Sequence, residues 1–307
     1  MPSKDTLYRK FHDHQTRLQS SDWAPKLQGD YICPLCLSSF NQQAITTEAL
    51  TLEHAPQNAL GGSIVALTCK DCNNVAGSII DCHFDNLVQQ LEFQHQESGA
   101  KKEGHFFDAS GRRIQGTLEY DNGNCLLKLS EKNNNPQIDL GSLAVGEEFS
   151  FEGKRIKYNP NCATAAILKN AYMLLFSKIG YTILTDDFYN ILRNYINNPT
   201  SYYLPRPLHR ICPSLPISDG VYLFQMPQVK GFLVAYSVTK QSTMRILVLI
   251  PAICTSYQKA ATFLRTMHKV KLYMLPNNDV LLTDTDKMHK LLRWSKSRTM
   301  QMSEVFD

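Results

Sequence analysis

Two Cys-x-x-Cys pairs constrain the fold of this chain more than any other feature. Cys33 and Cys36 form the first pair, and Cys69 and Cys72 form the second. Two such turns supply the four thiolates that tetrahedral Zn²⁺ prefers. A site closed by four thiolates leaves no position for a substrate, so we expect a structural zinc ion here. The sequence therefore predicts a zinc-held module that joins segments far apart along the chain.

The other cysteines and the composition suggest a cytoplasmic globular protein. The 307 residues include nine cysteines, which cannot all pair in disulfides, and clustered cysteines in a reducing compartment indicate metal binding. Hydrophobic residues make up 43% of the chain and charged residues 20%, as in ordinary folded domains. The first residues lack the apolar core of a secretory signal, and no apolar run reaches the length of a membrane span. We therefore expect a cytoplasmic protein with no membrane partner.

Short elements lie between and after the cysteine pairs. The patterns predict a strand over residues 50–54, a Gly-rich loop over 55–63, a second strand over 64–68 and a helix over 73–93. The expected order is therefore strand, loop, strand, helix.

The rest of the chain predicts a mixed region with antiparallel strands and helices. Alternating stretches on either side of Asp121-Asn122-Gly123-Asn124 predict a hairpin within an antiparallel sheet. Residues 163–178 have the apolar spacing of an amphipathic helix that ends near Gly180. Three apolar stretches within 221–250 predict a meander. We therefore expect an α+β chain with three parts: a module with an N-terminal helix over 1–100, β-hairpins followed by two helices over 101–200, and an α+β region of unknown role over 201–307.

The residues around the second cysteine pair carry a family resemblance. Leu52-Glu53-His54 is followed by a Pro, by the Gly61-Gly62 pair and by Leu67-Thr68-Cys69-x-x-Cys72-Asn73-Asn74 with Gly77. In combination, over about residues 30–90, these motifs resemble the HNH endonucleases that carry a four-cysteine zinc-binding frame. The resemblance implies an N-terminal ββα-metal nuclease module that hydrolyses DNA phosphodiester bonds. Proteins with this module include restriction enzymes and effectors of antiphage defence, so a role of that kind is expected.

The resemblance also implies a role for three residues. By position, His54 is the general base, and Glu53 and Asn73 hold a catalytic Mg²⁺ or Mn²⁺. Hydrolysis needs a base to activate water and a cation to neutralise the growing charge. Histidine has an unperturbed pKa of about 6.5 and can accept a proton at cytoplasmic pH, and oxygen ligands suit Mg²⁺. Neighbours on a regular strand point to opposite faces, so Glu53 and His54 can serve one phosphate only where the backbone bends.

Two positions depart from the family pattern. Glu53 stands where the family more often has Asp, and Ser63 and Ile64 occupy the region of the central Asn. Asn58 is the nearest candidate for the supporting role of that Asn. The missing Asn leaves open an alternative, a non-catalytic zinc-ribbon protein that binds nucleic acid or serves as a scaffold. An RNA substrate is also left open.

The distribution of basic residues suggests where DNA could bind. The net charge of +4 permits an anionic partner without requiring one. Basic clusters recur at Lys101-Lys102, Arg112-Arg113, Lys154-Arg155 and 287–298, and each alone is typical of a solvated face. Cleavage of duplex DNA needs a phosphate track beyond the small module. We expect Arg112 and Arg113 to contribute to it because they follow the module closely. DNA is thus the expected partner, and a protein activator or a homo-oligomer is left open.

Overall fold

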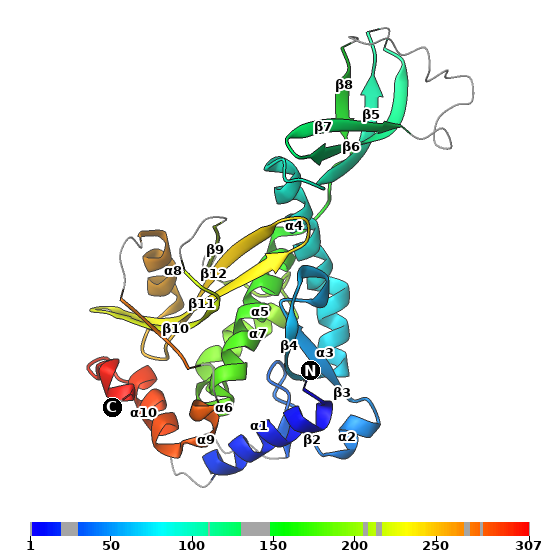
Figure 1. The fold of residues 1–307 in the computed structure, drawn as a ribbon. Helices are drawn as coiled ribbons and strands as arrows, with labels where there is room; N and C mark the ends of the chain where they lie inside the picture. Colours follow the sequence, from blue (N-terminus) through cyan, green and yellow to red (C-terminus); the bar gives the residue numbers. More distant parts are fainter. Residues whose placement is uncertain are drawn as a thin grey trace. The chain divides into compact units, whose positions relative to one another are not determined.

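The computed structural model describes residues 2–19, 30–109, 111–129, 148–204, 208–212, 217–266, 271–276 and 279–306. Its helices and antiparallel sheets confirm the α+β class (Figure 1). The contacts divide the chain into two units. Unit 1 comprises residues 1–84, 159–238 and 243–307, and unit 2 comprises 85–158 and 239–242. These boundaries fall elsewhere than the expected ones at residues 100 and 200, because the helices and strands after Asn159 share unit 1 with the N-terminal segment.

The cysteine pairs lie on a hairpin followed by a helix in unit 1. Strands β3 (Leu50–Ala55) and β4 (Ser63–Cys69) pair antiparallel, and the one-turn helix η1 (Asn58–Leu60) lies in the loop between them. The helix that follows begins earlier than residue 73. It runs through α3 (Lys70–Val75), a π-helical turn η2 (Ala76–Asp81) and α4 (Cys82–Gln94), which belongs to unit 2 from Asp85 onward.

A buried helix, α5 (Pro160–Ile179), forms the centre of unit 1. Asn159 caps its N-terminus by accepting a hydrogen bond from the backbone N–H of Asn161, and Pro160 fits the first turn because it needs no donor there. Side chains on most faces of α5 are buried, so the helix is central and not amphipathic as predicted. It contacts β3 and β4 on one side and the strands β9, β10 and β12 of a larger sheet on another.

That larger sheet has five strands in the order β13-β10-β11-β12-β9. The three consecutive strands β10, β11 and β12 confirm the predicted meander. Most of their residues are buried, as expected for a sheet covered on both faces. The strands are β9 (His209–Ile211), β10 (Gly220–Met226), β11 (Val229–Thr239), β12 (Thr243–Pro251) and β13 (Leu272–Met274).

The remaining elements of unit 1 surround this core. No helix in the described part of the chain has the length and apolar character needed to cross a bilayer. These elements are α1 (Lys4–Gln19), β1 (Tyr31–Ile32), β2 (Ser39–Phe40), α2 (Gln43–Thr46), α6 (Tyr181–Leu184), η5 (Asp187–Tyr189), α7 (Asn190–Asn197), α8 (Tyr257–Thr266), α9 (Val280–Thr283), α10 (Thr285–Lys296) and η6 (Ser303–Val305).

Unit 2 is built on an antiparallel sheet with the strand order β7-β6-β5-β8. The predicted hairpin is confirmed: Asn122 and Gly123 join β6 to β7 with φ angles of 48° and 81°, the left-handed conformations that a two-residue hairpin turn needs. The end of α4 contributes Glu92, which accepts hydrogen bonds from the backbone N–H groups of Gln241 and Ser242. The strands are β5 (Lys101–Phe107), β6 (Arg113–Asp121), β7 (Asn124–Leu129) and β8 (Ser150–Gly153).

Candidate metal centre and catalytic site

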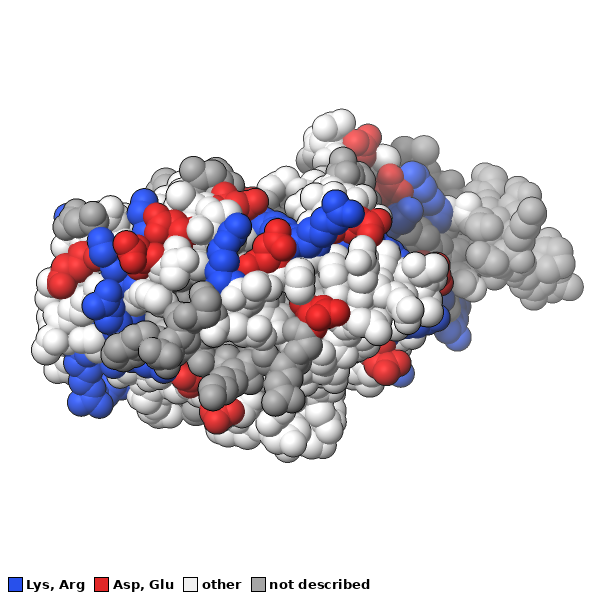
Figure 2. Space-filling model, turned by 90° about the horizontal axis from the view of Figure 1, so that it is seen from below, with Lys and Arg blue, Asp and Glu red and all other residues white. Residues whose placement is uncertain are grey.

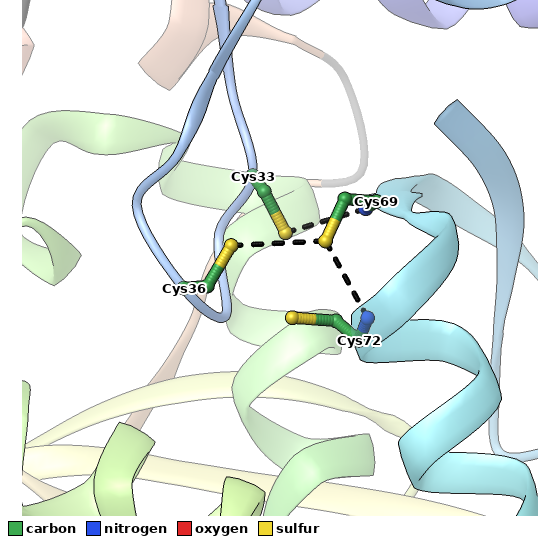
Figure 3. A group of neighbouring side chains, drawn as sticks. All are labelled: Cys33, Cys36, Cys69 and Cys72. Atoms are coloured by element: carbon green, nitrogen blue, oxygen red, sulfur yellow. Dashed lines mark hydrogen bonds between the residues drawn. The ribbon is translucent and has the colours of Figure 1, made fainter. Parts of the chain in front are cut away.

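The four cysteines converge on one point (Figure 3). Cys33 and Cys36 lie on the turn between β1 and β2, Cys69 ends β4, and Cys72 lies in the first turn of α3. All four Sγ atoms lie within 4.8 Å of one another. Sulfurs at about 2.3 Å from a tetrahedral Zn²⁺ stand roughly 3.8 Å apart, and the Sγ atoms of Cys36 and Cys69 are separated by 3.7 Å. The residues present therefore fit a metal ion such as zinc.

The surroundings of the cysteines favour thiolate ligands. The backbone N–H of Cys69 donates to Cys33 Sγ at 3.4 Å, and that of Cys72 donates to Cys69 Sγ at 3.4 Å. Hydrogen bonds among the four thiols lower the pKa of Cys36 and Cys69 and raise the pKa of Cys33 and Cys72, so these groups share protons as one cluster. Metal binding requires deprotonated sulfur, so this arrangement suits a cation.

Three buried tyrosines tie the cysteine turn to the core of unit 1. The Tyr31 hydroxyl donates to the Leu67 carbonyl at 2.7 Å, next to the end of β4. Tyr181 donates to the Ile32 carbonyl at 2.7 Å, and Tyr172 of α5 donates to the carbonyl of Pro34. Burial raises the pKa of all three hydroxyls, so they remain donors across the physiological range. The metal centre is therefore anchored to the fold by directed hydrogen bonds.

His54 lies at an irregular point of the β3–β4 hairpin. Glu53 pairs with Ala66 and His54 pairs with Ile64, so Val65 is an extra residue on β4 and the register shifts between Glu53 and His54. The irregular backbone that their shared role requires is present at this step. The two side chains nevertheless have different surroundings, since Glu53 is buried and His54 is half-buried.

The loop after His54 is folded back tightly on itself. Gly61 has a φ of 79°, and a Cβ atom on Gly62 would lie 1.4 Å from the carbonyl oxygen of Pro56. Asn58, the candidate for the supporting role, begins η1; its backbone carbonyl accepts from Gly61 at 3.1 Å and its side chain is exposed. The loop borders a cavity of about 280 Å³ whose walls include residues 55–56 and 61–63. The Gly-Gly pair thus fixes the backbone that follows His54.

Replacement of Gly62 by Ala is expected to lower the free energy of unfolding by more than about 1 kcal/mol, because the added methyl group has no room beside the Pro56 carbonyl. Gly77→Ala is a matched control, since a Cβ at Gly77 meets nothing within 4 Å and Ala favours the helix. Urea unfolding of both variants measures the difference. Equal stability of Gly62→Ala and the wild type would contradict this view of the loop.

Glu53 takes part in a buried ion triad. Its Oε2 atom accepts a hydrogen bond from Thr68 Oγ1 at 3.0 Å, and its Oε1 atom lies 3.0 Å from Lys169 Nζ on α5. The same ammonium group contacts Asp81 Oδ2 at 2.9 Å. Burial by itself lowers the pKa of Lys169, but the charges of Glu53 and Asp81 outweigh it and the pKa is raised. Lys169 is therefore a positively charged group buried inside unit 1.

This arrangement does not fit a divalent ion on Glu53. The side chain is 2% exposed, and both carboxylate oxygens already have partners. Asn73, the other expected ligand, lies within α3 and donates its Nδ2 hydrogen to Thr51 Oγ1 at 2.9 Å; the helix cap is Cys69. The cation between the carboxylates of Glu53 and Asp81 is the ammonium group of Lys169.

Sequence reasoning missed Asp81 and Lys169. Asp81 ends the π turn and contacts the ammonium group of Lys169, which also holds Glu53. The available signal for Lys169 was a lysine directly after the apolar run Ala165 to Leu168 of a helix. His83 has a structural contact: its Nδ1 atom accepts from the backbone N–H of Asn159, just before α5.

The two arginines expected to bind DNA lie on unit 2 with partners of their own. Arg112 Nε lies 2.9 Å from Asp108 Oδ2, which neutralises its charge locally. Arg113 contacts the ring of His105, with its terminal nitrogen 2.8 Å from Nε2. Their role in DNA binding stays a prediction.

Compared with known proteins, the chain matches no family model, no curated protein and no solved structure.

Proposed function

We propose that unit 1 contains an HNH-type endonuclease module that hydrolyses DNA phosphodiester bonds with His54 as the general base. The observation that carries the proposal is the position of His54: it is half-buried, on a hairpin whose second strand ends in the metal centre, at a register shift and before a rigid loop. The backbone that carries His54 is thus part of a paired strand, and its side chain is partly accessible to water.

The reaction follows from the chemistry of His54. The neutral imidazole takes a proton from a water molecule, and the oxygen of that water attacks phosphorus. The bond between phosphorus and the bridging oxygen breaks, and that oxygen leaves with a proton from solvent. The products are a phosphate monoester and an alcohol. A divalent ion supplies charge neutralisation in enzymes of this class, but we assign it no step here because Glu53 is held by Lys169.

The variant His54→Ala is expected to reduce DNA cleavage about 10²- to 10⁴-fold, the usual contribution of a general base. His12, another half-buried histidine of unit 1, provides the matched control, and His12→Ala is expected to retain activity. Plasmid DNA is incubated with Mg²⁺, with Mn²⁺ or with no added metal, and an RNA substrate is run in parallel. Zinc content and thermal unfolding establish that each protein is intact.

A folded, metal-loaded wild type that leaves DNA and RNA uncut under every condition contradicts this proposal. It favours a second candidate, a non-catalytic zinc-held protein that binds nucleic acid. The observation in favour of that candidate is that the Lys169 ammonium group pairs with the carboxylates of both Glu53 and Asp81. Cleavage that survives in His54→Ala would instead assign catalysis to other residues.

A further inference from the structure

A basic hollow lies on unit 2. Its volume is about 320 Å³, and its walls come from α4, from the start of β5, from β6 and from the segment after β8. The antiparallel pairing of β5 with β8 brings these segments together: Gly104 pairs with Gly153, and the Lys154 backbone N–H donates to the Glu103 carbonyl. The charged residues of its walls are Lys101, Lys102, Glu103, Lys154 and Arg155.

Positive charge dominates this hollow. Glu103, its one carboxylate among the described residues, pairs with Lys154 at 2.8 Å, and that contact lowers the pKa of Glu103. Glu119 lies opposite Lys101 in the strand register, but its carboxylate pairs with Lys128 at 2.7 Å. Among the described residues, no carboxylate pairs with the exposed side chains of Lys101 and Arg155. Two cations therefore remain for a ligand.

The composition of the walls indicates the ligand chemistry. Lys102 extends over the Phe93 ring, with Nζ 5.2 Å from the centroid, so the hydrocarbon stem is supported and the charge stays near the hollow. Ammonium groups attract phosphate as point charges, and a guanidinium group binds two of its oxygens at once. Basic and acidic side chains are interspersed over the face drawn in Figure 2. In the hollow, four basic side chains accompany one carboxylate, so positive charge is concentrated there.

We propose that this hollow binds phosphate groups of a DNA backbone and is a DNA-docking site of unit 2. The choice of DNA as the source of phosphate rests on the proposed function. Contacts of this type hold the duplex independently of its sequence, because every base pair offers the same phosphates. Free polyphosphate carries the same chemistry, so the experiment includes inorganic pyrophosphate as a competing ligand.

The test measures binding of a fluorescently labelled duplex to the full chain by anisotropy, without added divalent metal, over a series of salt concentrations. The double variant Lys101→Gln/Arg155→Gln is expected to bind duplex DNA of any sequence about tenfold more weakly than the wild type. It should also reduce, by about two, the steepness with which the logarithm of the association constant falls against the logarithm of the salt concentration. Arg9→Gln/Lys259→Gln removes the same charge at exposed positions of unit 1 and is the matched control. Both pairs are accessible in the fold, and thermal unfolding confirms that each variant is folded.

Loss of affinity and slope in the hollow variant alone supports the proposal. The proposal is overturned if the wild type binds no DNA, if the hollow variant binds like the wild type, or if Arg9→Gln/Lys259→Gln loses as much affinity as the hollow variant. Inorganic pyrophosphate that binds more tightly than DNA also overturns it. Binding without cleavage leaves this inference intact and contradicts only the proposed catalysis, so the two failures are distinguishable.

Discussion

Replacing Lys169 by Met is expected to lower the free energy of unfolding by about 3–5 kcal/mol, as when one partner of a buried charge pair is removed. The ammonium group is 1% exposed and holds two carboxylates, those of Glu53 and Asp81. Without it, the Glu53 carboxylate stays buried with only the Thr68 hydroxyl as a partner. Urea unfolding measures the loss. Lys178→Met, at a partly exposed position of the same helix, is the control and should cost about 1 kcal/mol or less.

The pH dependence of this variant has a definite sign. In the wild type the pKa of Lys169 is raised above 10.5, so its stabilisation is fully present below that pH and is lost as the pH rises through the folded-state value. In Lys169→Met, the buried carboxylates lack their cation, so the folded state favours their protonated, neutral form. The folded variant then binds more protons than the unfolded chain, and the stability deficit shrinks as the pH falls. A deficit that grows in acid contradicts the ion triad.

A triple variant separates lost charge pairing from lost packing. Glu53→Gln/Lys169→Met/Asp81→Asn leaves no net charge in the triad, and we expect it to recover part of the stability lost in Lys169→Met.

The single variant Lys169→Met also tests whether Glu53 and Asp81 can bind a divalent metal ion. If Mn²⁺ raises the melting temperature of Lys169→Met and leaves that of the wild type unchanged, the two carboxylates can accept a divalent cation once the ammonium group is gone. No effect of Mn²⁺ on either protein would argue against Glu53 as a metal ligand.

The elements of this fold were predictable where the pattern was local. The Asn122-Gly123 turn and the apolar strands of the meander each determine their structure within a few residues, whereas the two Cys-x-x-Cys pairs are recognised by their spacing and join distant segments. The helix after β4 was predicted to start at residue 73 but starts at Lys70. A cysteine can take the cap position when its sulfur accepts the Cys72 N–H, and local propensity does not contain this information.

The chemistry of the candidate site was less accessible to sequence reasoning. The character of Glu53 depends on Lys169, which follows it by more than a hundred positions and reaches it only because α5 packs on the hairpin. The prediction that α5 is amphipathic was wrong because tertiary packing buries polar residues of this helix as well as apolar ones. Likewise the hollow of unit 2 needs β5 and β8 paired before Lys101 and Arg155 share a wall.

Removal of the metal ion is expected to have the second large effect, because binding of structural zinc contributes about 10–16 kcal/mol in small zinc modules at neutral pH. The change is a chelator under reducing conditions, since Cys36 and Cys69, 3.7 Å apart, could otherwise oxidise once the ion is lost. We expect amide exchange to accelerate over residues 31–40 and over the end of β4. The β10–β12 meander should stay protected, because its own apolar contacts bury it.

The variant Cys36→Ser tests the same link without a chelator. Cys36 is an exposed member of the cluster, so its replacement removes a thiolate with little change in packing. Cys82→Ser, at an exposed cysteine outside the cluster, is the matched control and should keep the wild-type zinc content and melting temperature. Leu50 at the start of β3 pairs with Cys69, so loss of the metal ion is also expected to weaken the pairing of β3, the strand that carries His54. Chelation that leaves both exchange and His54-dependent cleavage unchanged would show that the hairpin is held without metal.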